Sequence, residues 1–209
     1  MAFDTIAGNG EYTSKSVGLT DPRERETFLA DIRYALKFAQ KLECPTMIVF
    51  SGSVVEGMPR DAQHASIVEG LKRAAAVVDK HGVTLLVENI DLEEDSKYYL
   101  WSVAEGLKII EEVSHPSVKF LYDCYHEQIS EGNLIEKLEK HIRDVRLVHV
   151  ADVPGRHAPG TGEIDYFNIF RRLAALKYDG YIAMEFLPTG DPVQSLRAAR
   201  ELVLRAAVP

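Results

Sequence analysis

Short apolar runs alternate along the chain with longer segments in which apolar residues recur every three or four positions. The runs have the length of buried strands, and they lie at residues 2–7, 46–51, 84–90, 119–125, 145–151 and 180–186. The longer segments have the spacing of amphipathic helices, at residues 21 onward, 60–80, 101–113, 134–141, 165–176 and 193–207. Strands that alternate with helices in this way predict parallel strands joined by right-handed crossovers.

Two of these helices carry a start signal. Asp21-Pro22 combines a capping side chain with proline at the first helical position, so we expect the first helix to begin there. Its apolar stripe consists of Phe28, Ile32, Leu36 and Ala39. Asp165 is expected to be the N-cap of the helix over 165–176.

The parallel strands could form an open sheet or a closed barrel. Gly8-Asn9-Gly10 is followed by Glu11-Tyr12-Thr13 and not by a helix, so it fails as a dinucleotide-binding loop. Ionisable residues near the ends of several strands favour the barrel instead. A complete (β/α)8 barrel needs roughly 250 residues, whereas this chain has 209. We therefore expect one domain, residues 1–209, that forms an α/β TIM barrel lacking its first two β/α units.

Four successive strands each carry an ionisable residue among apolar neighbours on one face, because side chains alternate with a period of two. These residues are Glu88, Asp123, His149 and Glu185. Each one alone is more typical of a capping, loop or core residue, but four on four strands predict convergence. Buried carboxylates need a counter-charge, and this donor set suits Mn²⁺ or Mg²⁺, with Co²⁺ or Zn²⁺ as less favoured ions.

Composition narrows the classes of partner. The net charge is −8 and apolar residues make up 46% of the chain, which disfavours nucleic-acid binding because that requires a basic surface. No apolar run approaches the roughly 18–20 residues of a membrane span. The N-terminus does not resemble a secretory signal, and Cys44 and Cys124 suggest no disulfide framework. We expect a cytoplasmic protein with a small-molecule substrate and no membrane partner.

Two further segments are candidates for substrate contact. His126 follows Asp123 by three residues, just past the predicted strand. The segment 153–165, VPGRHAPGTGEID, is rich in proline and glycine, as expected for a loop of specific turns. It follows the strand of His149, so Arg156 could hold a substrate oxygen through its planar guanidinium. His126 could instead be an ordinary loop histidine, and Arg156 could form a surface ion pair.

The sequence resembles the hydroxypyruvate isomerase family, within the xylose isomerase-like barrels that include the ketose 3-epimerases. The resemblance covers nearly the whole chain, and it is carried by the segments LLVENI, FLYDCYHEQISEGNL, VRLVHVADVPGRHAPGTGEIDY and GYIAMEF. It implies that Glu88, Asp123, His149 and Glu185 are metal ligands, that Glu88 and Glu185 form an acid/base pair, and that His126 and Arg156 contact the substrate. Histidine at position 149 is the usual residue of the ketose epimerases, whereas hydroxypyruvate isomerases tend to have glutamine there. The resemblance also implies a homo-oligomer.

The expected activity is metal-dependent isomerisation of a small hydroxy-carbonyl compound, hydroxypyruvate or a ketose, by proton transfer through an enediolate. If both glutamates act on one carbon, the chain would be a ketose 3-epimerase. Three rival hypotheses are a dehydratase or lyase, an abasic-site endonuclease and a non-catalytic truncated barrel.

Overall fold

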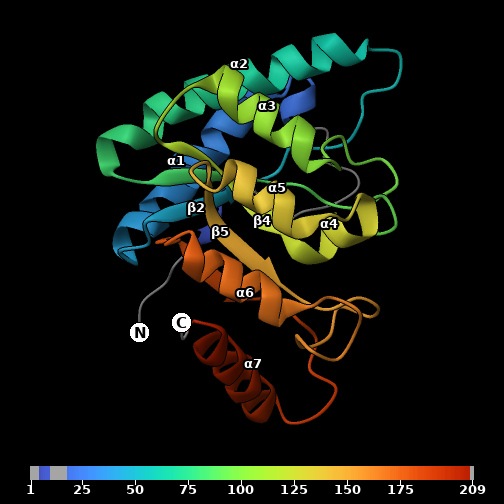
Figure 1. Ribbon diagram of the computed structural model, residues 1–209. Coiled ribbons are helices and arrows are strands. Elements are labelled where there is room, and N and C mark those ends of the chain that lie inside the picture. The colour runs from blue at the N-terminus through green and yellow to red at the C-terminus, as the bar shows by residue number, and fades with distance from the viewer. Residues whose placement is uncertain (1–4, 10–17, 208–209) are drawn as a thin grey trace. The chain divides into compact units, whose positions relative to one another are not determined.

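The computed structural model describes residues 5–9 and 18–207. In this part of the chain there are six β-strands, seven α-helices and two short 3₁₀ helices (Figure 1). The chain divides into two compact units, residues 1–121 and residues 122–209. None of the described helices is both long enough and apolar enough to span a membrane. The single-domain interpretation and the cytoplasmic setting stay predictions.

The first unit contains parallel strands that pair in chain order. They are β1 (Ile6–Ala7), β2 (Thr46–Val49), β3 (Thr84–Glu88) and β4 (Val118–Asp123), whose last two residues belong to the second unit. In the β3–β4 pair, Glu88 lies opposite Leu121. Residues 2–4 of the predicted first strand lie outside the described residues. The other three predicted strands of this unit are confirmed, although β2 and β3 are shorter than expected.

Three helices cover this sheet: α1 (Arg25–Lys41), α2 (Arg60–Val78) and α3 (Val103–Val113). The helix α2 packs against both α1 and α3, and the 3₁₀ helices η1 (Gly18–Thr20) and η2 (Asp79–His81) contact it. The predicted stripe of α1 is buried as expected. Residues 85–87 of β3 are fully buried, as is typical of a parallel strand covered on both faces.

The first helix does not begin where the sequence predicts. It begins at Arg25, because Asp21 forms a local turn with Arg23 instead of capping a helix. The Asp21 carboxylate accepts hydrogen bonds from the backbone N–H of Arg23 at 2.8 Å and from its Nε at 2.9 Å. A carboxylate engaged in this way is not available to the first turn of α1.

The second unit contains four helices and one complete pair of strands. The helices are α4 (Cys124–Ser130), α5 (Leu134–His141), α6 (Tyr166–Ala175) and α7 (Pro192–Ala206), and the strands are β5 (Val145–Val150) and β6 (Tyr181–Met184). The strands are parallel, and His149 lies opposite Ala183. Figure 1 shows α6 and α7, in orange and red, packed side by side.

The segment after β4 differs from the prediction. The strand ends at Asp123, and Cys124 and Tyr125, which we expected in the strand, form the first residues of α4. The reason is that the Asp123 side chain caps this helix, so the chain changes from strand to helix without a loop. The N-cap prediction for Asp165 is confirmed, because its side chain accepts a hydrogen bond from Asn168 N at 3.1 Å.

Candidate metal centre

Asp123 is the last residue of β4 and the N-cap of α4, and its two carboxylate oxygens have different surroundings. Oδ1 accepts hydrogen bonds from the backbone N–H of Tyr125 at 2.7 Å and of His126 at 3.1 Å. Oδ2 lies 3.6 Å from Nδ1 of His149. The side chain is only 2% exposed. One oxygen therefore holds the start of the helix, while the other is directed at the neighbouring histidine.

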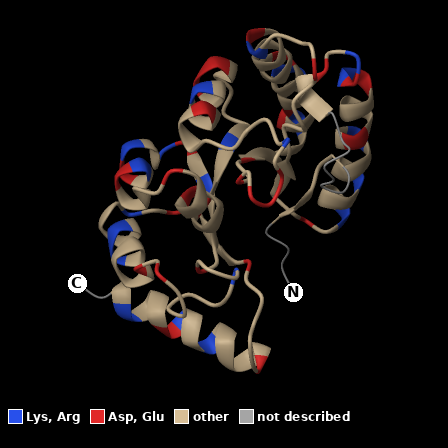
Figure 2. Cartoon of the chain, turned by 90° about the vertical axis from the view of Figure 1, so that its right-hand side faces the viewer, with Lys and Arg blue, Asp and Glu red and all other residues tan. Residues whose placement is uncertain are grey.

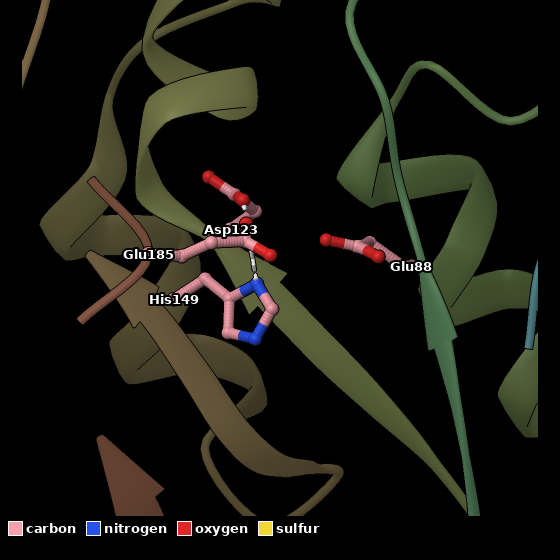
Figure 3. A group of neighbouring side chains, drawn as sticks. All are labelled: Glu88, Asp123, His149 and Glu185. Carbon is pink, nitrogen blue, oxygen red and sulfur yellow. Dashed lines mark ion pairs between the residues drawn. The ribbon is translucent and has the colours of Figure 1, made fainter. Parts of the chain in front are cut away.

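His149 and Glu185 complete a cluster with Asp123. His149 lies on β5 and is buried, and its Nδ1 is 3.0 Å from Oε2 of Glu185. Glu185 comes directly after β6, where its backbone N–H donates to the carbonyl of Val150 at 3.1 Å. One donor atom from each of the three side chains lies within 4.8 Å of the others. Figure 3 shows these side chains as sticks, with the imidazole of His149 beside the carboxylates.

Arg156 brings a positive charge to this cluster. Its Nη2 lies 2.7 Å from Oε2 of Glu185 and 3.8 Å from Oδ2 of Asp123. Its guanidinium carbon is 5.1 Å from the ring centroid of Tyr125, the second residue of α4. The guanidinium therefore faces two of the three candidate ligands, as a group that binds substrate oxygens beside a metal would.

The charges of the cluster favour ionised carboxylates. Burial opposes the ionisation of Asp123, but the charge of His126, the neighbouring His149 at 3.6 Å and the charge of Arg156 together hold its pKa below the usual range. For Glu185, burial is likewise the largest influence, and the ion pair with His149, together with Arg156, outweighs it and lowers the pKa. Both carboxylates are thus ionised at neutral pH, which is the state a cation requires.

His126 is more deeply placed than the sequence suggests. It lies on α4, is 1% exposed, and its Nε2 is 3.7 Å from Oδ2 of Asp123. The prediction that it follows the strand is confirmed, but the residue belongs to a helix and not to an exposed loop. Its contact with a substrate stays a prediction.

Glu88 is the predicted ligand that belongs to the first unit. It is the last residue of β3, is 5% exposed, and its backbone carbonyl accepts a hydrogen bond from the hydroxyl of Tyr98 at 3.2 Å. The second unit by itself brings together Asp123, His149, Glu185, Arg156 and His126. The part of Glu88 in the centre stays a prediction.

A small hollow adjoins Glu185 and Arg156. It has a volume of about 510 Å³ and is lined by these two residues together with Met184, Phe186 and Leu187. Hollows of a few hundred Å³ hold small molecules. The cluster therefore has room beside it for a substrate of a few carbon atoms.

Sequence reasoning missed Asp152, which lies two residues after β5. Its side chain is fully buried, and it accepts hydrogen bonds from three backbone N–H groups of the loop that carries Arg156. The one sequence signal for this role was its position between a buried strand and a glycine- and proline-rich loop, because the turns of such a loop need side-chain hydrogen bonds to hold them.

The donor set of the second unit fits a divalent cation. Two carboxylate oxygens and one imidazole nitrogen converge there, and both carboxylates are ionised at neutral pH. Mn²⁺ and Mg²⁺ prefer such oxygen-rich sets, and imidazole also suits Co²⁺ and Zn²⁺. A site of this kind at the carboxyl ends of parallel strands is typical of enzymes with a β/α barrel.

Residues 5–206 match the family model described as the xylose isomerase-like TIM barrel, and the chain belongs to this family. It is 32% identical over 199 residues to the putative hydroxypyruvate isomerase of Danio rerio, covering 92% of this chain and 72% of that protein. It is 33% identical over 201 residues to the 2-oxo-tetronate isomerase of Pectobacterium atrosepticum, covering 94% of this chain and 74% of that protein. With such relatives, the chain is an enzyme of the isomerase class.

A solved structure shows the same fold. The crystal structure of AP endonuclease, family 2, from Brucella melitensis superposes with a TM-score of 0.89 at 27% sequence identity, covering 96% of this chain and 78% of that one. The xylose isomerase-like TIM-barrel fold predicted from the sequence is therefore confirmed. The absence of the first two β/α units stays a prediction.

Proposed function

We propose that the chain is a metal-dependent isomerase that acts on a small hydroxy-carbonyl compound, hydroxypyruvate or a ketose. The observation that carries this proposal is the convergence of Asp123, His149 and Glu185 beside Arg156 and a hollow of about 510 Å³. The relatives named putative hydroxypyruvate isomerase and 2-oxo-tetronate isomerase support the same substrate class.

In this proposal the ion is Mn²⁺ or Mg²⁺, with Co²⁺ or Zn²⁺ less favoured, and Asp123, His149 and Glu185 hold it together with Glu88. When bound, it would supply Lewis-acid stabilisation of the negative charge that develops on the substrate oxygens. Asp123 contributes Oδ2, because its Oδ1 is engaged in capping α4. The helix cap fixes the direction of the ligand oxygen.

The glutamates move the proton. The lowered pKa of Glu185 keeps its carboxylate ionised, so it can accept a proton from a carbon next to a carbonyl group. Glu88, in its protonated form, would donate a proton to the resulting enediolate, and both glutamates would regain their starting protonation states by exchange with water. If the proton is added to the adjacent carbon and the hydroxyl proton passes to the former carbonyl oxygen, the product is an isomer of the aldose–ketose type; if the proton is added to the same carbon from the other face, the product is an epimer.

Two side chains orient the substrate in this proposal. Arg156 presents its guanidinium beside Glu185, where it would bind the substrate oxygen next to the carbon that loses its proton. His126 is buried beside Asp123 and would donate a hydrogen bond to a second oxygen. The binding partner is thus a small molecule, and self-association of the chain stays a prediction.

The test follows proton exchange directly. Protein loaded with Mn²⁺ is incubated with hydroxypyruvate and a panel of ketoses in D₂O, and deuterium incorporation and products are followed by NMR. We expect exchange at the carbon next to the carbonyl, and we expect Glu185→Gln and Glu88→Gln to lower it by at least about 100-fold, the lower range of general-acid–base contributions. Glu201→Gln, on the exposed face of α7, is the matched control.

Exchange within a few-fold of wild type in Glu185→Gln would contradict the proton-transfer role. The product separates the remaining classes, since a new ketose isomer indicates 3-epimerisation and loss of water indicates a dehydratase. No exchange with any compound by metal-loaded, folded protein would favour a non-catalytic barrel.

Endonuclease activity is the rival raised by the name of the Brucella structure. The net charge of −8 opposes it, and Figure 2 shows basic and acidic residues interspersed along the helices. Binding to duplex DNA with an abasic site, measured by fluorescence anisotropy at two salt concentrations, tests it. Tight, salt-sensitive binding would support the endonuclease and contradict the small-molecule assignment.

A further inference from the structure

The loop between β5 and α6 is held by one buried carboxylate. Oδ1 of Asp152 accepts hydrogen bonds from the backbone N–H of Val153 and of Ile164, both at 3.0 Å, and Oδ2 accepts one from Gly160 at 2.8 Å. Ile164 is twelve residues along the chain from Asp152, so the carboxylate joins the two ends of the loop. Hydrogen bonds to an ionised acceptor are stronger than neutral ones.

The backbone of the loop is closed around this carboxylate. The N–H of Asp152 donates to the carbonyl of His157 at 2.8 Å, and the N–H of Glu163 donates to the carbonyl of Val153 at 2.8 Å. Gly162 permits this approach, since a Cβ there would lie 2.6 Å from Oδ1 of Asp152. The loop therefore has one specific conformation that depends on the Asp152 side chain.

This conformation determines where Arg156 points. Arg156 has φ 57° and follows Gly155 with φ 89°, so two successive left-handed residues turn the chain back. The guanidinium then lies 2.7 Å from Oε2 of Glu185. The orientation of the Arg156 side chain therefore depends on this turn, and it changes when the turn relaxes, because the arginine side chain is flexible.

The loop also holds the backbone beyond β6. The N–H of Leu187 donates to the carbonyl of Arg156 at 2.7 Å, and Nδ1 of His157 lies 2.9 Å from the carbonyl of Leu187. Leu187 follows Glu185 closely in the chain, with only Phe186 between them. The loop therefore contacts both the side chain of Glu185 and the segment that carries it.

We propose that Asp152 is a positioning residue of the candidate centre: it fixes the loop of residues 153–164 and thereby places Arg156 and Glu185. It touches neither substrate nor metal in this proposal and acts through these two side chains. The inference rests on the proposed function only for its effect on turnover, because its effect on the loop is measurable without a substrate.

The substitutions form a graded series. Asp152→Asn retains an oxygen for two of the three hydrogen bonds and places an NH₂ group against the third donor, whereas Asp152→Ala removes all three. Asp191→Asn is the matched control, because the Asp191 side chain caps α7 through the hydrogen bond from Gln194 N at 2.9 Å. Arg156→Gln alone and combined with Asp152→Asn completes a double-mutant cycle.

The first readout is hydrogen–deuterium exchange of the metal-free protein. We expect faster exchange in Asp152→Asn for residues 153–164 and 185–188, faster still in Asp152→Ala, and unchanged exchange in α6. Exchange equal to wild type in the loop would overturn the proposal. Faster exchange throughout β5 and α6 would also overturn it, because it would indicate a general loss of stability.

The second readout is the affinity for Mn²⁺ and the turnover of the metal-loaded protein. We expect Asp152→Asn to weaken Mn²⁺ binding and to lower kcat/KM, each by about 10-fold, the lower range for residues that support a ligand. As we also expect for Arg156→Gln, it should raise KM more than it lowers kcat. In the Arg156→Gln background the same substitution should have less than half that effect. Full additivity of the two substitutions in kcat/KM would overturn the proposal. If the wild type shows no turnover, the proposed function is refuted, but hydrogen–deuterium exchange and Mn²⁺ affinity still decide the role of Asp152.

Discussion

The strands that carry Asp123 and His149 pass into their following helices in opposite ways. After β4 the helix begins at the next residue, and the ligand candidate Asp123 is itself the cap. After β5 a loop of residues 151–165 intervenes before α6, and it is held by a buried aspartate that is not a ligand candidate. At the β4–α4 junction, one carboxylate is both the candidate ligand and the structural group. At the β5–α6 junction, His149 is the candidate ligand and Asp152 is the structural group.

This difference has a consequence for substitutions. At the first junction, a change of the ligand also changes the helix, so binding and stability respond together unless the substitution keeps the capping oxygen. At the second junction, the ligand and the structural carboxylate can be changed one at a time. Substitutions that affect metal binding and stability separately therefore test whether the two junctions differ in this way.

The largest effect on stability is expected at Gly162. A Cβ at this position would lie 2.1 Å from the carbonyl oxygen of Val153 and 2.6 Å from Oδ1 of Asp152, so Gly162→Ala forces the loop open. We expect a loss of about 1–3 kcal/mol in the free energy of unfolding, as for overpacked sites, measured by urea denaturation. Gly190→Ala is the control, since a Cβ there meets nothing within 4 Å, and equal stability of the two variants would contradict the tight closure of the loop.

A smaller effect is expected at Asp123. Asp123→Ala removes the hydrogen bonds to Tyr125 N and His126 N and should cost about 1 kcal/mol, as typical for loss of an N-cap. Asp123→Asn retains an oxygen for the cap and should be closer to wild type in thermal unfolding of the metal-free protein. Equal destabilisation by both substitutions would argue against the capping role of Oδ1.

The smallest effect is expected on the way stability falls in acid. The folded pKa of Asp123 lies below the unfolded value of about 3.9, because His126, His149 and Arg156 outweigh the effect of burial. The ionised carboxylate therefore contributes stability above the unfolded pKa. This contribution declines as the pH falls below the unfolded pKa and is lost as the pH falls through the folded pKa. Urea denaturation of metal-free protein between about pH 6 and pH 3 should show a shallower decline for Asp123→Asn than for wild type; identical declines would contradict the assignment.

The fold and the convergence of the candidate ligands Asp123, His149 and Glu185 could be predicted from the sequence because strand periodicity is strong in buried parallel strands. The alternation that placed Asp123 and His149 on one face of their strands requires only a period of two, and the structure brings both to Glu185. The strand end at Asp123 was missed because Cys124 and Tyr125 fit a strand as well as a helix, and only the capping hydrogen bonds decide between them.

Asp152 could not be assigned from spacing. Its function depends on three backbone N–H groups up to twelve residues away, and a contact between a side chain and distant backbone leaves no periodic pattern. The predicted start of α1 was wrong for a related reason. An Asp-Pro pair fits a helix cap and a local turn equally, and here the hydrogen bonds from Arg23 to Asp21 stabilise the turn.

The metal centre is tested most directly by calorimetric titration of the wild type, Asp123→Asn and the control Glu201→Gln with Mn²⁺. We expect about one bound ion per chain for the wild type and the control, and at least about 100-fold weaker binding for Asp123→Asn, in which an oxygen for the helix cap remains. Binding by Asp123→Asn as tight as that of the wild type, or no binding by the wild type, would contradict a metal centre formed by Asp123, His149 and Glu185.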